Sequence, residues 1–176
     1  DPGAFDILSR KVFPALIRKT PQDRAARIWV AGCSTGEEAY SIAMCFVEVA
    51  EQMRSRTPIQ VFATDINEAA IEKARRGTYL DNITADVSPE RLSRFFVREG
   101  REFQINRSLR DLCVFSRHDL LNDPPFSRMC LVSCRNLLIY LDHMQEQALS
   151  RFHFALNPGG YLLLGKSETA TSSPGL

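Results

Sequence analysis

One glycine-containing turn decides the fold of this chain, and it reads Ala31-Gly32-Cys33-Ser34-Thr35-Gly36-Glu37-Glu38-Ala39-Tyr40-Ser41. A short apolar run at residues 27–30 precedes the turn, and a segment of helical periodicity follows it. A strand, a tight glycine turn and the start of a helix form the unit that builds a nucleotide-type pocket in α/β folds. We therefore expect a ligand to bind against this turn, with Gly32 among the residues that contact it.

The helix after the turn begins with two carboxylates, Glu37 and Glu38. They cancel the positive end of the helix dipole, so this helix start suits a phosphate poorly. It suits a cofactor that carries hydroxyl groups and a positive charge, which favours S-adenosylmethionine (SAM) over NAD or ATP. A capping box is the alternative, because Ser34 with Glu37 or Thr35 with Glu38 has the required spacing. We expect Glu38 to contact the ligand and Glu37 to cap the helix.

Composition limits the class of protein. With 176 residues, 44% of them hydrophobic and 24% charged, the chain suits one globular domain with a sizeable core. A net charge of +1 gives no general attraction to nucleic acid or anionic membranes. No apolar run approaches the roughly 20 residues of a membrane-spanning helix, and no leader-like segment starts the chain. We expect neither a nucleic-acid partner nor membrane insertion.

Five cysteines, at positions 33, 45, 113, 130 and 134, indicate a reducing compartment. Their number is odd, they lie mostly in or beside apolar runs, and they form no CxxC pair. We therefore expect reduced thiols in a cytoplasmic protein. With only three scattered histidines, no metal site is predicted. The abrupt start and the linker-like residues 171–176 suggest a piece of a larger protein.

Helical and extended patterns alternate along the chain. Residues 3–19 have helical spacing and predict an opening helix that is strained near Pro14. A helix capped by Asn67 and ended by Gly77 follows the second strand, and the last helix begins at Asp142 with Gln145 placed for a capping box. Strands are predicted at 27–31, 59–65, 112–116, 129–133 and 161–165, the last after a turn at 157–160. The pattern predicts an α/β fold with a mostly parallel sheet covered on both faces.

Residues 78–111 break this alternation and indicate a small inserted subdomain. Ser88 is placed to start a short helix that contains Leu92, Phe95 and Phe96, and residues around 103–105 suit a hairpin. We therefore expect one domain over residues 1–176 with a small α/β insert at about 78–111.

Polar side chains gather where the predicted strands end, which is where ligands lie in such sheets. Asp65 is placed to accept the hydroxyls of a ribose, although it could also cap the next helix. For Asp119, capping of a turn and contact with adenine stay equally open. Arg135 and Asn136 follow an apolar strand, so a ligand or a buried polar network must satisfy them. Without a ligand role, Tyr140 would be an aromatic residue at the edge of the core.

Four segments make the pattern recognisable: RIWVAGCSTGEEAYSIA at 27–43, FATDI at 62–66, SCRNLLIY at 133–140 and PGGYLLLGKSE at 158–168. In this order they closely resemble the CheR family, the SAM-dependent methyltransferases of chemotaxis-receptor glutamates. The resemblance implies a Rossmann-like class I methyltransferase sheet, SAM as the cofactor and S-adenosylhomocysteine as its product. It also implies a receptor cytoplasmic domain or similar signalling protein as the partner, and fusion to further signalling domains.

The resemblance assigns roles to particular residues. It implies that Glu38 and Asp65 contact the methionine and ribose parts of SAM, and that Asp119 with Leu120 meets the adenine. Arg135 and Asn136 would line the methyl-donor pocket, and Tyr140 would lie beside the reactive methyl group. Arg135 and Tyr140 are thus the candidate catalytic residues, which orient the reactants. A glutamate nucleophile with a pKa near 4.3 is ionised at neutral pH, so alignment and desolvation suffice without a general base.

The chain departs from the family pattern at three places. It starts after the position of a Thr/Phe/Phe/Arg stretch whose arginine is thought to hold the substrate. Cys130 stands where the family carries an aspartate, so we expect a capping or pocket-shaping carboxylate to be lost. The hairpin around 99–102 is short for gripping a receptor tail. Two alternatives to a receptor methyltransferase follow: a SAM-sensing regulatory module without catalysis, and a small-molecule O-methyltransferase.

Overall fold

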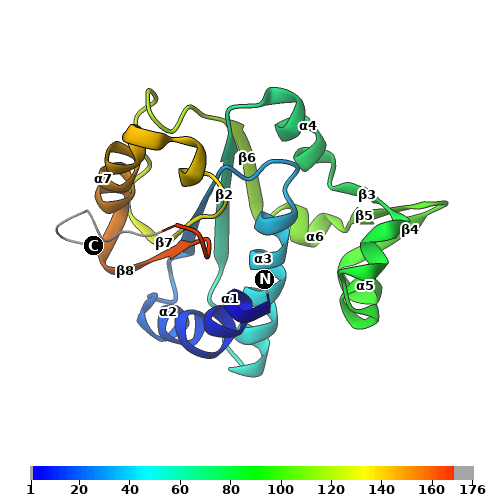
Figure 1. The fold of residues 1–176 in the computed structure, drawn as a ribbon. Helices are drawn as coiled ribbons and strands as arrows, with labels where there is room; N and C mark the ends of the chain where they lie inside the picture. Colours follow the sequence, from blue (N-terminus) through cyan, green and yellow to red (C-terminus); the bar gives the residue numbers. More distant parts are fainter. Residues whose placement is uncertain (1, 169–176) are drawn as a thin grey trace.

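A parallel sheet of five strands forms the centre of the computed structural model, which describes residues 2–168 (Figure 1). The strands are β1 (Ala26–Ala31), β2 (Ile59–Asp65), β6 (Cys113–Arg117), β7 (Met129–Cys134) and β8 (Leu156–Leu164). Their order is β6-β2-β1-β7-β8, and every neighbouring pair is parallel. The chain moves outward from β1 to β2 and β6 and then returns to β7 on the other side of β1. Such a reversal is the place where open α/β sheets bind ligands.

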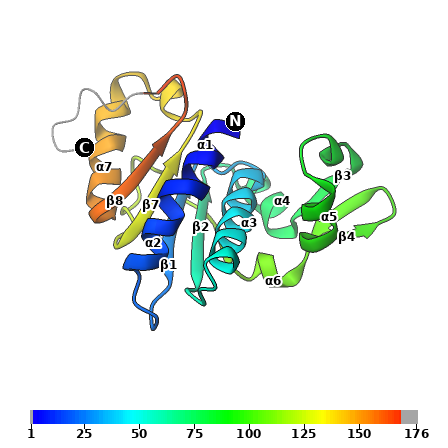
Figure 2. The ribbon, with the colours of Figure 1, turned by 90° about the horizontal axis from the view of Figure 1, so that it is seen from below.

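Helices cover both faces of the sheet, as the sequence pattern predicts. One face carries α1 (Pro2–Ile7), α2 (Phe13–Lys19), α3 (Glu37–Gln52) and α4 (Glu68–Arg76), and the opposite face carries α7 (Gln145–Ala155) (Figure 2). Alternate residues of β1 serve the two layers. Ile28 packs in the same cluster as Phe46 of α3, whereas Trp29 stacks edge-on against Phe152 of α7 at 5.5 Å between ring centroids.

The first helical segment is continuous but contains one wide turn. Between α1 and α2, residues Leu8–Val12 form a π-helical turn, in which the amide of Phe13 donates to the carbonyl of Leu8. Pro14 follows within the first turn of α2 and has no N–H to donate. The helix predicted over residues 3–19 is therefore present, with a wide turn directly before the proline near which strain was expected.

Three predicted helix boundaries are confirmed. The side chain of Asn67 accepts a hydrogen bond from the amide of Ala70 at 3.2 Å, and Gly77 ends α4 with a φ of 60°. At the start of α5 (Pro89–Phe95), the Ser88 hydroxyl accepts from the amide of Arg91 at 3.3 Å. Phe96 was expected inside this helix but begins a strand, because the chain turns extended there at φ −124° and ψ 154°.

The segment between α4 and β6 forms a second, three-stranded antiparallel sheet beside the main one. It contains β3 (Thr78–Leu80), the 3-10 helix η2 (Asp81–Ala85), α5, β4 (Phe96–Glu99), β5 (Glu102–Ile105) and α6 (Arg107–Arg110). The predicted hairpin is β4–β5, and β3 adds a strand to it that the sequence pattern did not predict. Arg91 fastens this insert to α3 through two hydrogen bonds to the carboxylate of Glu48, at 2.8 and 2.6 Å.

Two expectations about the last third of the chain are wrong. β8 starts at Leu156, and residues 157–160 form a bulge within it instead of a turn before it. The predicted capping box at Asp142 is absent, because Gln145 donates its side-chain amide to the carbonyl of Leu138 instead. Two 3-10 turns, η3 (Leu138–Tyr140) and η4 (Asp142–Met144), lead into α7. Across residues 2–168, none of the helices combines the length and apolarity needed to cross a membrane.

Candidate functional site

The glycine turn between β1 and α3 is held in a conformation that excludes side chains. Gly32 and Gly36 have φ values of 72° and 93°. A Cβ on Gly32 would lie 3.0 Å from Leu137, and one on Gly36 would lie 2.9 Å from Ala74. The carbonyl of Thr64 in β2 accepts two hydrogen bonds from the start of the turn, at 2.8 and 2.9 Å. The turn therefore requires glycine at both positions, because its backbone packs directly against neighbouring side chains.

Asp65 connects the end of β2 to this turn. Its Oδ2 accepts from the amide of Ser34 at 2.8 Å, and its Oδ1 accepts from the amide of Asn67 at 2.9 Å. The side chain that caps α4 is that of Asn67, so Asp65 is not the helix cap. Each carboxylate oxygen can accept more than one hydrogen bond. Asp65 is thus held rigidly at the strand end with accepting capacity left for a ligand hydroxyl.

Glu38 and Arg135 come together across the end of the sheet, as the sequence analysis expects. The Ser133 hydroxyl, at the end of β7, donates to Oε1 of Glu38 at 2.6 Å. The guanidinium of Arg135 lies 3.4 Å from Oε2 of the same carboxylate. Both charged side chains are mostly covered, at 23% and 12% exposure. The sequence analysis did not single out Ser133; its only signal was a hydroxyl at the end of an otherwise apolar strand.

Neither predicted capping box forms at the start of α3. The cap position is occupied by Gly36, which has no side chain, and no side chain bonds the first helical amides. Glu37 instead accepts from the hydroxyl of Thr35 at 2.7 Å. The prediction that Glu37 caps the helix is therefore wrong. Glu38 turns toward β7 because Ser133 and Arg135 hold it there.

Glu168 holds two loops of the site together. This carboxylate is only 8% exposed and accepts hydrogen bonds from the amides of Asn136, Leu137, Leu138 and Gly165, at 3.0, 2.9, 2.7 and 2.8 Å. The first three amides belong to the loop after β7, and the fourth follows β8. Asn136 adopts a φ of 59°, which turns the chain so that these amides converge. Glu168 belongs to the fourth of the segments that resemble the CheR family, at 158–168, but this role was not predicted from the sequence.

Tyr140 lies on the surface, in η3, with 75% of the residue exposed. The alternative of an aromatic residue at the edge of the core is therefore wrong. The turn that carries Tyr140 is anchored by Leu138, which is 1% exposed and donates its backbone amide to Glu168. The exposed tyrosine is thus carried by an anchored turn five residues after Arg135, where an incoming substrate could reach it.

Asp119 is engaged within its own loop. Its carboxylate accepts from the amides of Leu121 and Asn122, at 2.9 and 3.1 Å, and from the side-chain amide of Asn122 at 2.9 Å. The side-chain hydrogen bond from Asn122, followed by the backbone bond from Leu121, lowers the pKa of Asp119. The turn-capping alternative is therefore what the structure contains. The amide of His118 donates to the carbonyl of Asp65 at 3.0 Å, which brings Asp119 and Leu120 to the same edge of the sheet.

Two cysteines lie in or near the elements that build the site. Burial, followed by the charge of Asp65, raises the pKa of Cys33 to about 12, so this thiol in the glycine turn is protonated and unreactive at neutral pH. Cys130 lies near the amino end of β7, at the opposite edge of the sheet from Arg135. A carboxylate at this position would therefore not reach Arg135, and the expected loss of a capping or pocket-shaping carboxylate stays a prediction. All five thiols are free, as expected.

The sequence of this chain is similar to that of a known protein family. Residues 1–175 match the family model described as the SAM-binding domain of CheR methyltransferases. The chain belongs to the CheR family. A chemotaxis protein methyltransferase of Borreliella burgdorferi is 34% identical over 179 residues, which cover 98% of this CheR domain and 63% of that protein. The domain thus spans slightly less than two thirds of such a relative.

Two further similarities concern the setting and the fold. A protein of Rhodobacter capsulatus, described as an uncharacterized 104.1 kDa protein in the hypE 3′ region, is 44% identical over 169 residues. The match covers 96% of the CheR domain but 18% of that protein. Among solved structures, the DszA carbon methyltransferase superposes with a TM-score of 0.57 at 16% identity, over 93% of this chain and 35% of its own. The fold is that of the class I SAM-dependent methyltransferases.

The residues of this edge fit SAM, the cofactor of the CheR family. Glu38 and Asp65 offer carboxylate oxygens for a positively charged ligand that carries hydroxyl groups. Arg135 is held by Glu38 and so does not turn the edge into a phosphate site. Among the described residues, no group of histidine, cysteine and acidic side chains is arranged to hold a metal ion.

Proposed function

We propose that this CheR domain transfers a methyl group from SAM to glutamate side chains of a chemotaxis receptor or a similar signalling protein. The observation that carries the proposal is the pairing of Glu38 with Ser133 and Arg135 at the carboxyl ends of the strands. The products are a γ-glutamyl methyl ester and S-adenosylhomocysteine. The 104.1 kDa relative supports a setting in which such a domain is joined to other segments.

The residues divide into a binding group and an orienting group. Gly32 and Asp65 bind the cofactor from the β1 and β2 side, Asp65 through the ribose hydroxyls. Asp119 is committed to its own turn, so the adenine contact falls to the backbone of that turn and to Leu120. Glu38, with Asn136 of the facing loop, closes the methionine side. Bound SAM supplies an electrophilic methyl group on a positively charged sulfur.

Arg135 and Tyr140 orient the reactants. The Arg135 guanidinium is anchored by Glu38 and can attract a carboxylate that approaches the pocket. The Tyr140 hydroxyl is placed at the surface, where it can donate a hydrogen bond to that carboxylate or accept one from the pocket. No residue has to remove a proton, because the glutamate nucleophile is already ionised. Catalysis then rests on alignment and on exclusion of water from the nucleophile.

Two measurements on the same preparation test the proposal. Calorimetry with SAM measures binding, and transfer of a tritiated methyl group to membranes that carry chemoreceptors measures activity. We expect binding together with a base-labile label, which is the mark of a carboxyl methyl ester. Binding without any label would instead favour the SAM-sensing regulatory module. Label on free carboxylic acids but not on receptors would favour a small-molecule O-methyltransferase.

A further inference from the structure

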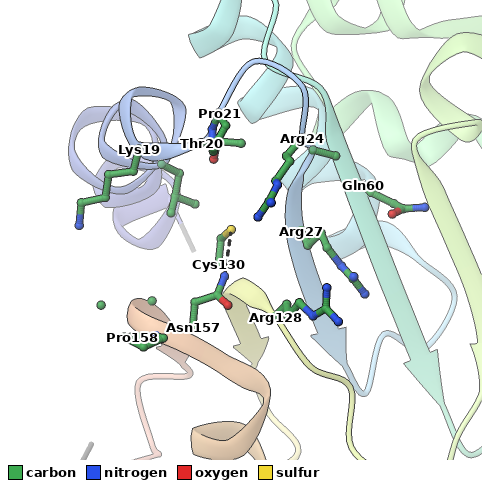
Figure 3. Close-up of a pocket in the computed structure, with 14 residues that line it drawn as sticks. Lys19, Thr20, Pro21, Arg24, Arg27, Gln60, Arg128, Cys130, Asn157 and Pro158 are labelled. Carbon is green, nitrogen blue, oxygen red and sulfur yellow. Dashed lines mark hydrogen bonds between the residues drawn. The ribbon is translucent and has the colours of Figure 1, made fainter.

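A second cavity lies at the amino ends of the strands, at the edge of the sheet opposite the SAM site (Figure 3). It has a volume of about 490 Å³. Its walls are the end of α2 with the loop into β1, the start of β7, and the bulge at residues 157–160 of β8. β1 has six residues, so it separates the two edges by roughly 17–20 Å. A ligand here would therefore not touch the residues assigned to SAM.

This pocket, which we call the amino-edge pocket, is lined by cations without acids. Four basic residues line it and no aspartate or glutamate does; the four are Lys19, Arg24, Arg27 and Arg128. Of the four, Arg24 extends into the hollow, whereas the side chains of the other three lie at its rim and turn outward (Figure 3). Among residues 2–168, none of the four forms an ion pair. The guanidinium of Arg27 lies over the ring of Phe62 at 4.9 Å, and its Nε is buried without a hydrogen-bond acceptor. Phe62 packs with Trp29 in the cluster against α7, so the Arg27 guanidinium lies on the face of the sheet opposite α2 and contributes its charge to the rim of the pocket.

The backbone around the pocket is shaped to keep it open. Arg128 has a φ of 57°, a strained value for a residue with a side chain, and it directly precedes β7. Gly159 has a φ of 71°, and a Cβ built on it would meet nothing nearer than the Lys19 Nζ at 4.0 Å. Figure 3 shows Arg24 and Asn157 extending into the hollow, where the amide of Asn157 donates to the Cys130 sulfur at 3.8 Å.

We propose that the amino-edge pocket binds a small molecule that carries two or more phosphate groups. Four cations spread around 490 Å³ cannot all contact one phosphate, whereas a chain of phosphates reaches several of them. Arginine donates two parallel hydrogen bonds to phosphate oxygens, and lysine adds a point charge. Leu16, Pro21 and Ala25 give the pocket an apolar wall, and its volume lies in the range of small-molecule sites. A nucleoside attached to the phosphates would find a surface there.

Calorimetry with two probes tests the proposal. Tripolyphosphate contains no adenine and cannot use an adenine site, and ATP is titrated with saturating S-adenosylhomocysteine present to occupy the other edge. We expect both probes to bind, with an affinity that falls steeply as salt is raised. Tighter binding of ATP would identify a nucleotide as the ligand, and equal affinities would identify the phosphate chain alone. No binding of either probe at millimolar concentration would overturn the proposal.

Three variants locate the binding. Cys130→Asp places a carboxylate among the four cations and should weaken tripolyphosphate binding at least tenfold. Arg24→Gln should weaken it several-fold. Arg56→Gln is the matched control, because Arg56 is exposed in the loop before β2 and does not line the pocket. Equal affinity in all three variants and the wild type would place any binding elsewhere and overturn the proposal.

Arg128→Gly separates binding from folding. Glycine adopts the observed φ without strain, so this variant should unfold at or above the wild-type temperature. It removes one cation and should still weaken tripolyphosphate binding several-fold. Unchanged affinity in a stably folded Arg128→Gly protein would show that the strained arginine does not serve the ligand.

Discussion

The two edges of the sheet differ in the sign of their charged side chains and in how those charges are paired. At the carboxyl edge, Glu37, Glu38, Asp65 and Glu168 each accept hydrogen bonds from backbone amides or hydroxyls of neighbouring loops. At the amino edge, the four basic side chains of the amino-edge pocket have no acidic partner in the described part of the chain. The acids at the carboxyl edge are therefore part of the framework, whereas at the amino edge only Arg27 packs on the fold, over Phe62, and the other three cations are exposed.

Replacing Glu168 by alanine would break the carboxyl edge most severely. Four amides would lose their acceptor at a position that is only 8% exposed, so we expect a loss of about 4 kcal/mol in the free energy of unfolding. Urea unfolding measures this loss. Glu99→Ala, an exposed carboxylate in the hairpin, is the control and should change stability by less than about 0.5 kcal/mol. A similar small change for Glu168→Ala would show that the loops hold without it.

Asp65→Ala tests whether Asp65 binds a ligand in addition to holding the glycine turn. We expect SAM affinity to fall about thirtyfold, or about 2 kcal/mol, because the ribose hydroxyls lose an acceptor and Ser34 loses its anchor. Calorimetry measures the change. Asp23→Ala, which removes an exposed carboxylate from the loop before β1, should leave SAM affinity as it is. If Asp65→Ala bound SAM normally, Asp65 would serve only the turn.

Tyr140→Phe tests whether the Tyr140 hydroxyl at the carboxyl edge takes part in methyl transfer. We expect methyl transfer to slow about tenfold while SAM affinity stays unchanged, because the hydroxyl orients the acceptor without holding the cofactor. Tyr161→Phe is the control, since that ring packs against the core in β8. A wild-type rate for Tyr140→Phe would remove the hydroxyl from the mechanism.

The smallest effect is expected from alkaline pH, through Cys33 in the glycine turn. Its pKa is raised to about 12 by burial and then by Asp65, so the folded state keeps the proton after the unfolded chain has lost it. Stability from this thiol is present below pH 9 and declines as pH rises toward 12, by about 1 kcal/mol between pH 9 and 10. Urea unfolding at both pH values, with Cys33→Ala alongside, measures it. An identical decline in the variant would contradict the assignment.

Much of the fold was predictable because its signals are local. Asn67, Gly77 and Ser88 mark helix ends through their own side chains or lack of one, and the predicted strand at 59–65 is β2 itself. The bulge at 157–160 was not predictable, because it depends on the register between β7 and β8, which is a tertiary property. β3 was missed for a similar reason: three residues become a strand only once β5 lies beside them.

The sequence predicted which polar residues meet at the carboxyl edge of the sheet, but not the hydrogen bonds between them; their roles toward SAM stay predictions. Strand ends brought Glu38, Asp65 and Arg135 to one edge, because parallel strands end together. The hydrogen-bond partners could be identified only from the structure. Gly36 occupies the cap position, so Glu37 accepts from the Thr35 hydroxyl. The carboxylate of Asp119 accepts from the side chain of Asn122. The four amides that converge on Glu168 come from two loops about 30 residues apart, and no sequence pattern encodes such a meeting. The amino-edge pocket was equally hidden, since its cations lie far apart in the sequence.

One hydrogen bond limits how freely the insert could be exchanged between relatives. Tyr79, in β3 of the insert, donates its hydroxyl to the carbonyl of Thr35 in the glycine turn at 2.8 Å. Burial, followed by the charge of Glu37, raises the pKa of this phenol, so it remains a donor across the whole physiological range. A chimaera built by transplanting another insert would leave the turn's carbonyl without its donor unless a tyrosine came with it. The insert and the cofactor turn therefore form a single unit for protein engineering, and the cut points belong outside both.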